Sequence, residues 1–174
     1  AVELGGIAGN ADSALAVAGE GAVAPVGEME GAGCTGGMRG SAAGALASLA
    51  CNAENQVAMA GSGAVAPLVQ MLGPGSTAGM REAAAAALAS LALNADNQVA
   101  IAGASAVSPL VQMLGPGSTA GMRESAARAL RNLAANADNQ VAIAGDGAVA
   151  PLVQMLGPGS TSGMRVSAAG ALAN

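Results

Sequence analysis

The chain repeats itself with a fixed period. Residues 55–96 and 97–138 form two 42-residue blocks that carry the same residue at 33 positions. Prolines and Met-Arg pairs recur at this spacing, at Pro25, Pro67, Pro109 and Pro151 and at Met38-Arg39, Met80-Arg81, Met122-Arg123 and Met164-Arg165. A period of about 40 residues is typical of a solenoid, in which each unit buries its apolar face by stacking on its neighbours. Function is therefore expected on a repeated surface.

The register divides the 174 residues into a single array. We expect the end of a preceding repeat at 1–12, a degenerate repeat 1 at 13–54, repeat 2 at 55–96, repeat 3 at 97–138 and a truncated repeat 4 at 139–174. Repeat 1 is degenerate because it has Glu28 and Glu30 in its second segment, and Glu30 stands where repeat 2 has Leu72. Since burying an unpaired charge is costly, this segment is expected to be displaced or to meet water.

Each unit is predicted to contain three helices, as repeat 2 illustrates. A short helix over 55–60 follows Glu54, whose counterparts Asp96 and Asp138 are candidate N-caps, and glycines after it favour its end. A second helix is expected to begin near Pro67, because proline suits a first helical turn. Its apolar residues have the spacing of a helix buried on one side, at Val65, Leu68, Val69 and Leu72.

The third helix of the unit is predicted to follow the Gly73-Pro74-Gly75 stop. Ser76 or Thr77 offers an N-cap oxygen, and the helix is expected to run to about Leu93. Its apolar edge is formed by Met80, Ala84, Leu88 and Leu91. The sequence therefore predicts an all-α fold.

Composition excludes several classes of function. A net charge of −5, with six arginines and no lysine, argues against a nucleic-acid partner, because phosphates are neutralised by clustered cations. The uncharged stretch 55–80 is interrupted by Gln70 and by glycine and proline, so no membrane span is expected. Without a basic and apolar leader segment, an intracellular protein is favoured.

Chemistry-bearing residues are scarce. His, Lys and Tyr are missing, and Cys34 and Cys51 have neither a base to activate them nor the spacing of metal ligands. We therefore expect no enzyme activity, no cofactor and no metal site. The Gly-Pro-Gly-Ser-Thr loops lack the lysine of a phosphate-binding loop and are interpreted as helix stops and caps.

The repeated unit resembles the armadillo repeat, with HEAT repeats as the rival. The likeness is carried by three segments of repeat 3, at 97–102, 106–114 and 126–134. The resemblance implies a right-handed superhelix whose third helices line a concave groove that binds extended peptides or protein segments. Family members hold the partner's backbone with an Asn on each third helix, often with a Trp one turn earlier. Here the Asn position has Ser48, Ser90, Asn132 and Asn174, and the Trp position has Gly44, Ala86, Arg128 and Gly170.

Polar residues of the expected groove concentrate in repeat 3. Glu124, Arg128, Arg131 and Asn132 share one face of a helix, so the arginines are candidate readers of carboxylates and Asn132 is a candidate backbone clamp. In this interpretation Arg128→Ala or Asn132→Ala lowers affinity without lowering stability. The alternative is an ordinary solvated face on which Glu124 and Arg128 form an i, i+4 pair. The arginine that recurs in every unit is expected to serve the fold by bonding carbonyls of an adjacent repeat.

The sequence therefore predicts a non-enzymatic scaffold that binds a protein or peptide, with an acidic partner as one expectation. The strongest alternative is a structural module that stacks end to end on other copies through apolar terminal faces. A designed or consensus-like array would also explain the near identity of repeats 2 and 3, as would recent duplication.

Overall fold

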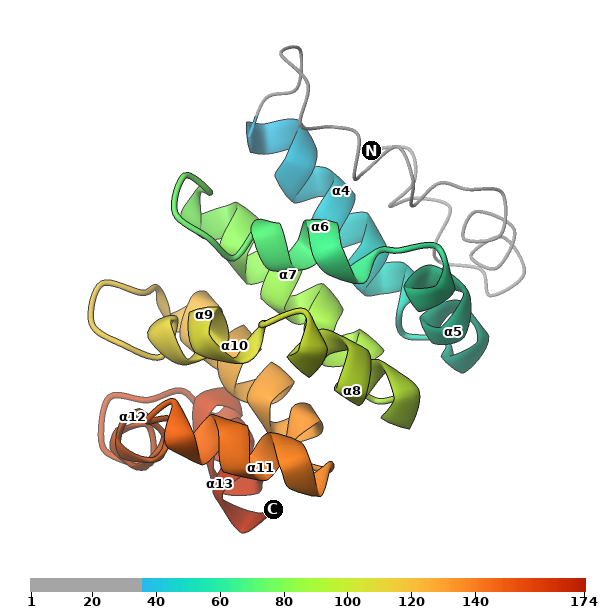
Figure 1. Ribbon diagram of the computed structural model, residues 1–174. Coiled ribbons are helices and arrows are strands. Elements are labelled where there is room, and N and C mark those ends of the chain that lie inside the picture. Colours follow the sequence, from blue (N-terminus) through green and yellow to red (C-terminus); the bar gives the residue numbers. More distant parts are fainter. Residues whose placement is uncertain (1–35) are drawn as a thin grey trace.

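The computed structural model describes residues 36–174, and every regular element in this part of the chain is a helix (Figure 1). The predictions for the repeat end at 1–12, for Glu28, Glu30 and Cys34, and for most of repeat 1 lie outside the described residues. The helices are α4 (Gly36–Leu49), α5 (Ala53–Gly61), α6 (Val65–Gln70), α7 (Ala78–Leu91), α8 (Ala95–Gly103), α9 (Val107–Gln112), α10 (Ala120–Leu133), α11 (Ala137–Gly145), α12 (Val149–Gln154) and α13 (Ser162–Ala173).

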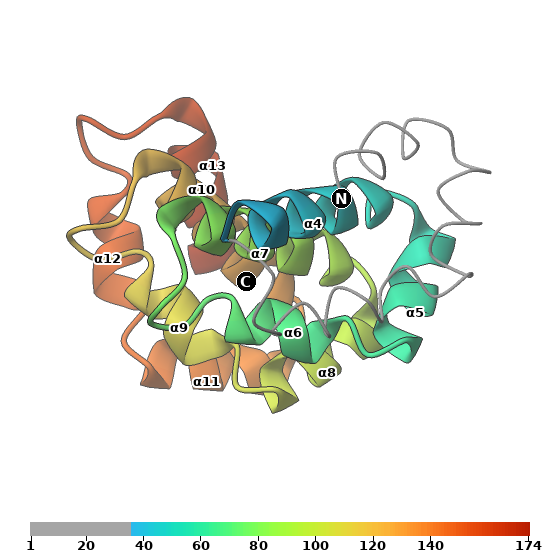
Figure 2. The ribbon, with the colours of Figure 1, turned by 90° about the horizontal axis from the view of Figure 1, so that it is seen from above.

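The helices form two layers. The third helices of successive units, α4, α7, α10 and α13, pack on one another in chain order. Figure 2 shows them on one side of the molecule, with the first and second helices of each unit on the other. This arrangement leaves one long face built from third helices, as expected for a groove.

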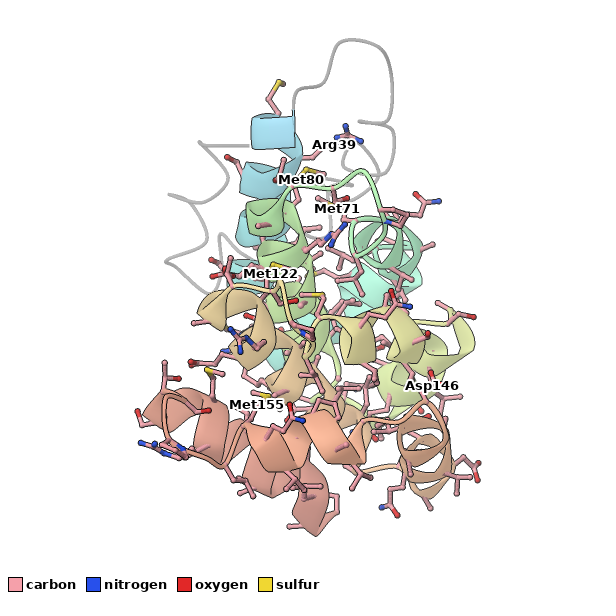
Figure 3. All side chains as sticks on the ribbon, turned by 90° about the vertical axis from the view of Figure 1, so that its left-hand side faces the viewer. Arg39, Met71, Met80, Met122, Asp146 and Met155 are labelled. Carbon is pink, nitrogen blue, oxygen red and sulfur yellow. The ribbon has the colours of Figure 1, made fainter. Side chains whose placement is uncertain are left out.

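The core between the layers is made of small and aliphatic residues. In α7 the side chains of Ala84, Ala85, Ala87 and Leu88 are fully buried, because this helix contacts α4, α6 and α10. Met80 of α7 packs against α4, with its Cγ 3.6 Å from the position that a Cβ on Gly40 would take (Figure 3). Small side chains at these contacts let the helices approach closely without the aromatic residues of an ordinary core.

The first helix of each unit begins two residues earlier than predicted, and its N-cap is an asparagine. The Oδ1 of Asn94 accepts hydrogen bonds from the backbone N–H groups of Asp96 and Asn97, at 3.0 and 3.2 Å. Asn52 and Asn136 cap α5 and α11 in the same way. The acidic residue that was expected as the cap instead lies in the first turn, where its charge suits the positive end of the helix dipole.

The second and third helices follow the predicted pattern with shifted ends. The helix α6 begins at Val65, two residues before Pro67, and Val65, Leu68 and Leu72 are buried as expected. Thr77 is the N-cap of α7, and its Oγ1 accepts a hydrogen bond from Met80 N at 3.2 Å. The helix α7 ends at Leu91 because the next residues turn toward the following unit.

Each first helix ends in a Schellman motif that needs a left-handed residue. After α5, Ala64 N donates to Met59 O and Gly63 N donates to Ala60 O, both at 3.0 Å, with Gly63 at φ 81°. After α8 the same two bonds form around Ser105, whose φ is 63°. Glycine adopts this conformation without the steric cost that a Cβ brings.

We expect Ser105→Gly to stabilise the protein by about 0.5–1 kcal/mol, because the substitution relieves the strained φ at this cap. The matched control is Gly63→Ser, which places the same strain after α5 and should lower stability by a similar amount. Urea denaturation of both variants measures the two effects. A loss of stability in Ser105→Gly would contradict the prediction.

Candidate functional site

A hollow of about 390 Å³ lies at the carboxyl ends of the third helices α7, α10 and α13. It contains three of the seven residues predicted for the site, namely Arg131, Asn132 and Asn174. The remaining lining residues are Ala92, Leu93, Gln98, Ala135, Gly170 and Ala173. The structure therefore places these three predicted residues together in one hollow.

The two asparagines connect consecutive third helices. The Nδ2 of Asn132 donates to Ala89 O of α7 at 2.7 Å, and the Nδ2 of Asn174 donates to Arg131 O of α10 at 3.0 Å. These carbonyls belong to the last turns of their helices, where backbone acceptors lack an intrahelical partner. Each asparagine thus satisfies a helix end of the preceding repeat.

These bonds leave Asn132 with unused hydrogen-bonding capacity. Its amide has two N–H donors and two acceptor lone pairs, and the described contacts use one of each, since Oδ1 also accepts from Arg131 Nε at 3.4 Å. One donor and one acceptor are left, which is the complement of one backbone amide unit. The bond to Ala89 also changes the expectation for Asn132→Ala, which should now lower stability as well as affinity.

Arg131 is half-buried and lies across the next repeat. A Cβ on Gly170 would overlap the Cδ of Arg131, so the absence of a side chain at Gly170 makes room for the arginine. Gly170 occupies the position that the resemblance assigns to an aromatic residue. The stem of Arg131 fills this space and holds the guanidinium at the hollow, whose lining residues include no Asp or Glu.

Three other predicted residues do not reach the hollow. The hydroxyl groups of Ser48 and Ser90 donate to carbonyls of their own helices, Gly44 O and Ala86 O, both at 3.2 Å. They therefore do not join the ladder of bonds that Asn132 and Asn174 make. Arg128 is exposed on α10 and has no described bond that orients it.

Glu124 lies at the other end of the groove and contacts the following repeat. Its Oε2 accepts a hydrogen bond from Thr161 Oγ1 at 2.8 Å, at the amino end of α13. A Cβ on Gly163 would overlap the Glu124 carboxylate, and one on Gly121 would overlap that of Glu82. Each carboxylate thus rests on a glycine in the first turn of the next third helix, where negative charge is favourable.

We expect Gly79→Ala to stabilise the protein more than Gly121→Ala does. Alanine is preferred over glycine in a helix by up to about 1 kcal/mol, and no atom lies within 4 Å of a Cβ on Gly79. At Gly121 the new methyl group must displace Glu82, which weakens a contact worth about 0.3–1 kcal/mol. Chemical denaturation of the two variants gives the comparison, and equal gains would contradict the role assigned to Glu82.

Gln98 also lines the hollow, although the sequence analysis predicts no role for it. Its Nε2 donates to Ala92 O at 3.0 Å, and the residue is buried at the base of the hollow. The signal was present, since an Asn-Gln pair recurs at the start of each unit at Asn55, Asn97 and Asn139. The recurrence identifies the repeat but does not by itself indicate which backbone groups the side-chain amides bond.

The recurring arginine does not make the carbonyl bonds expected from the sequence. The Nε atoms of Arg39, Arg81 and Arg123 are buried and have no hydrogen-bond partner. Their side chains extend from the first turns of the third helices, and Figure 3 shows Arg39 at the start of α4. Each Nε is therefore shielded from solvent with no carbonyl acceptor within hydrogen-bond distance.

Among residues 36–174 there is no group of three or more Cys, Asp or Glu side chains placed to hold a metal ion. In the same part of the chain, no helix combines the length and apolar character needed to cross a membrane.

The chain is similar to known repeat proteins. The profile of the Armadillo/beta-catenin-like repeat family matches residues 52–93 and 94–135. Similar solved structures include an engineered protein that is 31% identical, with a TM-score of 0.89 over 99% of this chain and 70% of that one. A designed armadillo repeat protein is 28% identical, with a TM-score of 0.88 over 99% and 72% of the two chains.

A second designed armadillo repeat protein was solved in complex with the peptide (KR)4. It is 27% identical, with a TM-score of 0.86 over 98% of this chain and 72% of that one. No curated protein sequence matches the chain.

Proposed function

Because the chain belongs to the armadillo repeat family, we propose that it is a non-enzymatic scaffold that binds an extended peptide or protein segment along α7, α10 and α13. The observation that carries the proposal is the amide of Asn132, which keeps one donor and one acceptor at the hollow. An extended peptide presents one N–H and one C=O at each residue, so it can pair with both. Asn174 offers a second amide one repeat further along.

The charge at the hollow favours an acidic partner. Arg131 supplies a guanidinium that can pair a carboxylate in a bidentate fashion, and no Asp or Glu lines the hollow. The designed relative bound to (KR)4 holds a basic peptide. This chain is expected to prefer the opposite charge at the hollow, since a basic peptide would meet Arg131 there without a compensating Asp or Glu side chain.

Peptide binding can be measured without background, because the protein contains no aromatic residue. We would titrate the protein into three peptides that each carry one Trp, with acidic, neutral or basic flanking residues, and follow fluorescence anisotropy. The acidic peptide should bind most tightly, and its affinity should fall as salt is raised. Tighter binding of the basic peptide would overturn the predicted charge preference. If none of the three peptides bound, the proposal that the groove binds extended peptides would be overturned.

Two substitutions separate the proposed roles. Arg131→Met should weaken the acidic peptide about tenfold, which corresponds to about 1.4 kcal/mol, and leave the neutral peptide nearly unchanged. Asn132→Ser copies repeat 2 and should weaken all three peptides alike, because it removes a backbone contact. Arg165→Met is the matched control, since Arg165 is exposed at the start of α13 and outside the hollow.

A second candidate function, self-association, rests on the apolar face of α12 and α13. Val149 is 49% exposed where Val107 is 5% exposed, and Leu156 is 43% exposed where Leu114 is 4% exposed. In repeat 3 the same face is covered by the following unit. The second candidate is therefore an assembly module in which this face packs on another copy of the chain.

Light scattering over a wide range of protein concentration tests the second candidate. Association through this face predicts a mass that rises with concentration, and it predicts that Val149→Glu abolishes the rise. A monomer at all concentrations would leave the groove as the functional surface. The exposed position makes Val149→Glu compatible with folding, which circular dichroism can verify.

A further inference from the structure

The recurring arginines each bury a hydrogen-bond donor that no described group accepts. Arg39, Arg81 and Arg123 occupy the same position in three consecutive third helices, and Nε lacks a partner in each. Buried polar groups in native proteins are nearly always hydrogen-bonded, so a repeated exception requires an explanation. Three copies of one exception point to a shared cause in the repeat.

A hollow of about 330 Å³ adjoins Arg81. It lies between the loop that follows α6 and the loop that precedes α10, with α9 at its base. Figure 1 shows these loops at one edge of the stack, away from the carboxyl ends of α7 and α10. The lining residues are Leu72, Gly73, Pro74, Arg81, Pro109, Gln112, Met113 and Ser118.

Three of the eight residues that line the hollow carry side-chain donors, and none of the eight is an Asp or a Glu. Arg81 contributes its guanidinium, Gln112 an amide and Ser118 a hydroxyl. No ion pair involving Arg81 is found among the described residues, and the neighbouring Glu82 carboxylate lies against Gly121 of α10. Arg81 also sits in the first turn of α7, where the helix dipole does not offset a positive charge.

We propose that this hollow binds a small oxyanion, a carboxylate or phosphate group, with Arg81 as the principal contact and Ser118 and Gln112 as additional donors. A guanidinium presents donors in a planar fork that matches two oxygens of such a group. A hollow of about 330 Å³ has room for such a group and for part of the molecule that carries it.

The same donors recur one unit later. Arg123 is the counterpart of Arg81 in repeat 3. Gln154 and Ser160 are the counterparts of Gln112 and Ser118 in repeat 4. A second oxyanion site of the same composition is therefore expected at Arg123. The site at Arg81 shares no lining residue with the hollow at Arg131 and Asn132. An experiment can therefore contradict the oxyanion site without contradicting the peptide site, and the reverse.

Nuclear magnetic resonance can test the site with sodium phosphate and sodium acetate as probes, each titrated against chloride at constant ionic strength. We expect saturable shifts of the Arg81 Nε–H signal and of the Ser118 backbone amide. Saturation by one probe alone identifies the preferred oxyanion. Saturation by both probes shows that the site binds the oxyanion group that phosphate and acetate share. Shifts that stay linear for both probes, or that match those of the exposed Arg165, would overturn the proposal.

Arg81→Met provides the matched variant. Methionine preserves the apolar stem and removes the unpaired Nε, so the fold should be retained, which the amide spectrum itself verifies. The response of the Ser118 amide should weaken at least about tenfold in Arg81→Met and stay unchanged in Arg165→Met. A Ser118 response of full strength in Arg81→Met would also overturn the proposal.

Discussion

Asn97→Asp is expected to lower the free energy of unfolding by about 3–5 kcal/mol at neutral pH. Asn97 is 4% exposed, and its Nδ2 donates to Leu91 O at 3.1 Å and to Gln56 O at 3.0 Å. One bond holds the end of α7 and the other holds α5 of the preceding repeat. Aspartate removes both donors and places a negative charge against two carbonyl oxygens.

The effect of Asn97→Asp should depend on pH. Burial and the two carbonyl oxygens raise the pKa of the introduced carboxyl in the folded state above its unfolded value of about 3.9. A raised folded pKa means that stability is greatest below the unfolded pKa and falls as pH rises through the folded pKa. The protonated acid also regains one donor. Urea denaturation at about pH 4 and about pH 7 should therefore show a smaller loss at the lower pH.

Two controls isolate the cause. Asp96→Asn changes the charge by one unit at the adjacent exposed residue and should alter stability by about 0.5 kcal/mol or less. Asn97→Leu removes both bonds without adding a charge, so its cost should not vary with pH. If Asn97→Asp lost no more stability than Asp96→Asn, the bonds between repeats would not be a major source of stability.

The repeated sequence was sufficient to predict the fold class. An all-α, right-handed superhelix of armadillo-like three-helix repeats is confirmed by the helices of residues 36–174 and by the similar solved structures. Prediction succeeded because the buried positions, such as Leu68 and Leu88, recur with helical spacing and the glycine and proline stops separate them. Both signals are local in the sequence, and the fixed repeat period predicts that successive units stack on one another.

Helix starts were harder to predict than helix existence. In Asn94-Ala95-Asp96 both the asparagine and the aspartate are good N-cap residues. The choice falls on Asn94, which lets Asn97 and Gln98 enter the helix with their amides directed at the end of α7. This preference arises from contacts six residues away and from the neighbouring repeat, which local propensity does not contain.

The candidate site was predicted only in part, because it too depends on contacts with neighbouring repeats. Helical spacing placed Glu124, Arg131 and Asn132 on one face of a single helix. It did not show that Glu124 would bond Thr161 of the next unit, or that Asn132 would bond Ala89 of the previous one. The roles of polar residues in a solenoid depend on the offset between neighbouring repeats, which one helix does not reveal.

The second large effect is expected for Leu130→Ala, with a loss of about 2–5 kcal/mol. Leu130 is fully buried in α10, which packs between α7 and α13. The buried residues beside it on α10, Ala126, Ala127 and Ala129, are too short to fill the space that the leucine leaves. A core without aromatic residues has few side chains that can move into the cavity, so most of the cost should remain.

Leu172→Ala is the matched control, because Leu172 holds the same position in repeat 4 and is 37% exposed. Its loss should be about 1 kcal/mol or less, since the substitution removes fewer contacts and leaves no closed cavity. Urea denaturation measures both. Because stability in a solenoid is carried by contacts between nearest neighbours, Leu130→Ala should also weaken the coupling of repeat 4 to the rest and broaden the transition. Equal losses in the two variants would show that burial between repeats does not set the stability of the array.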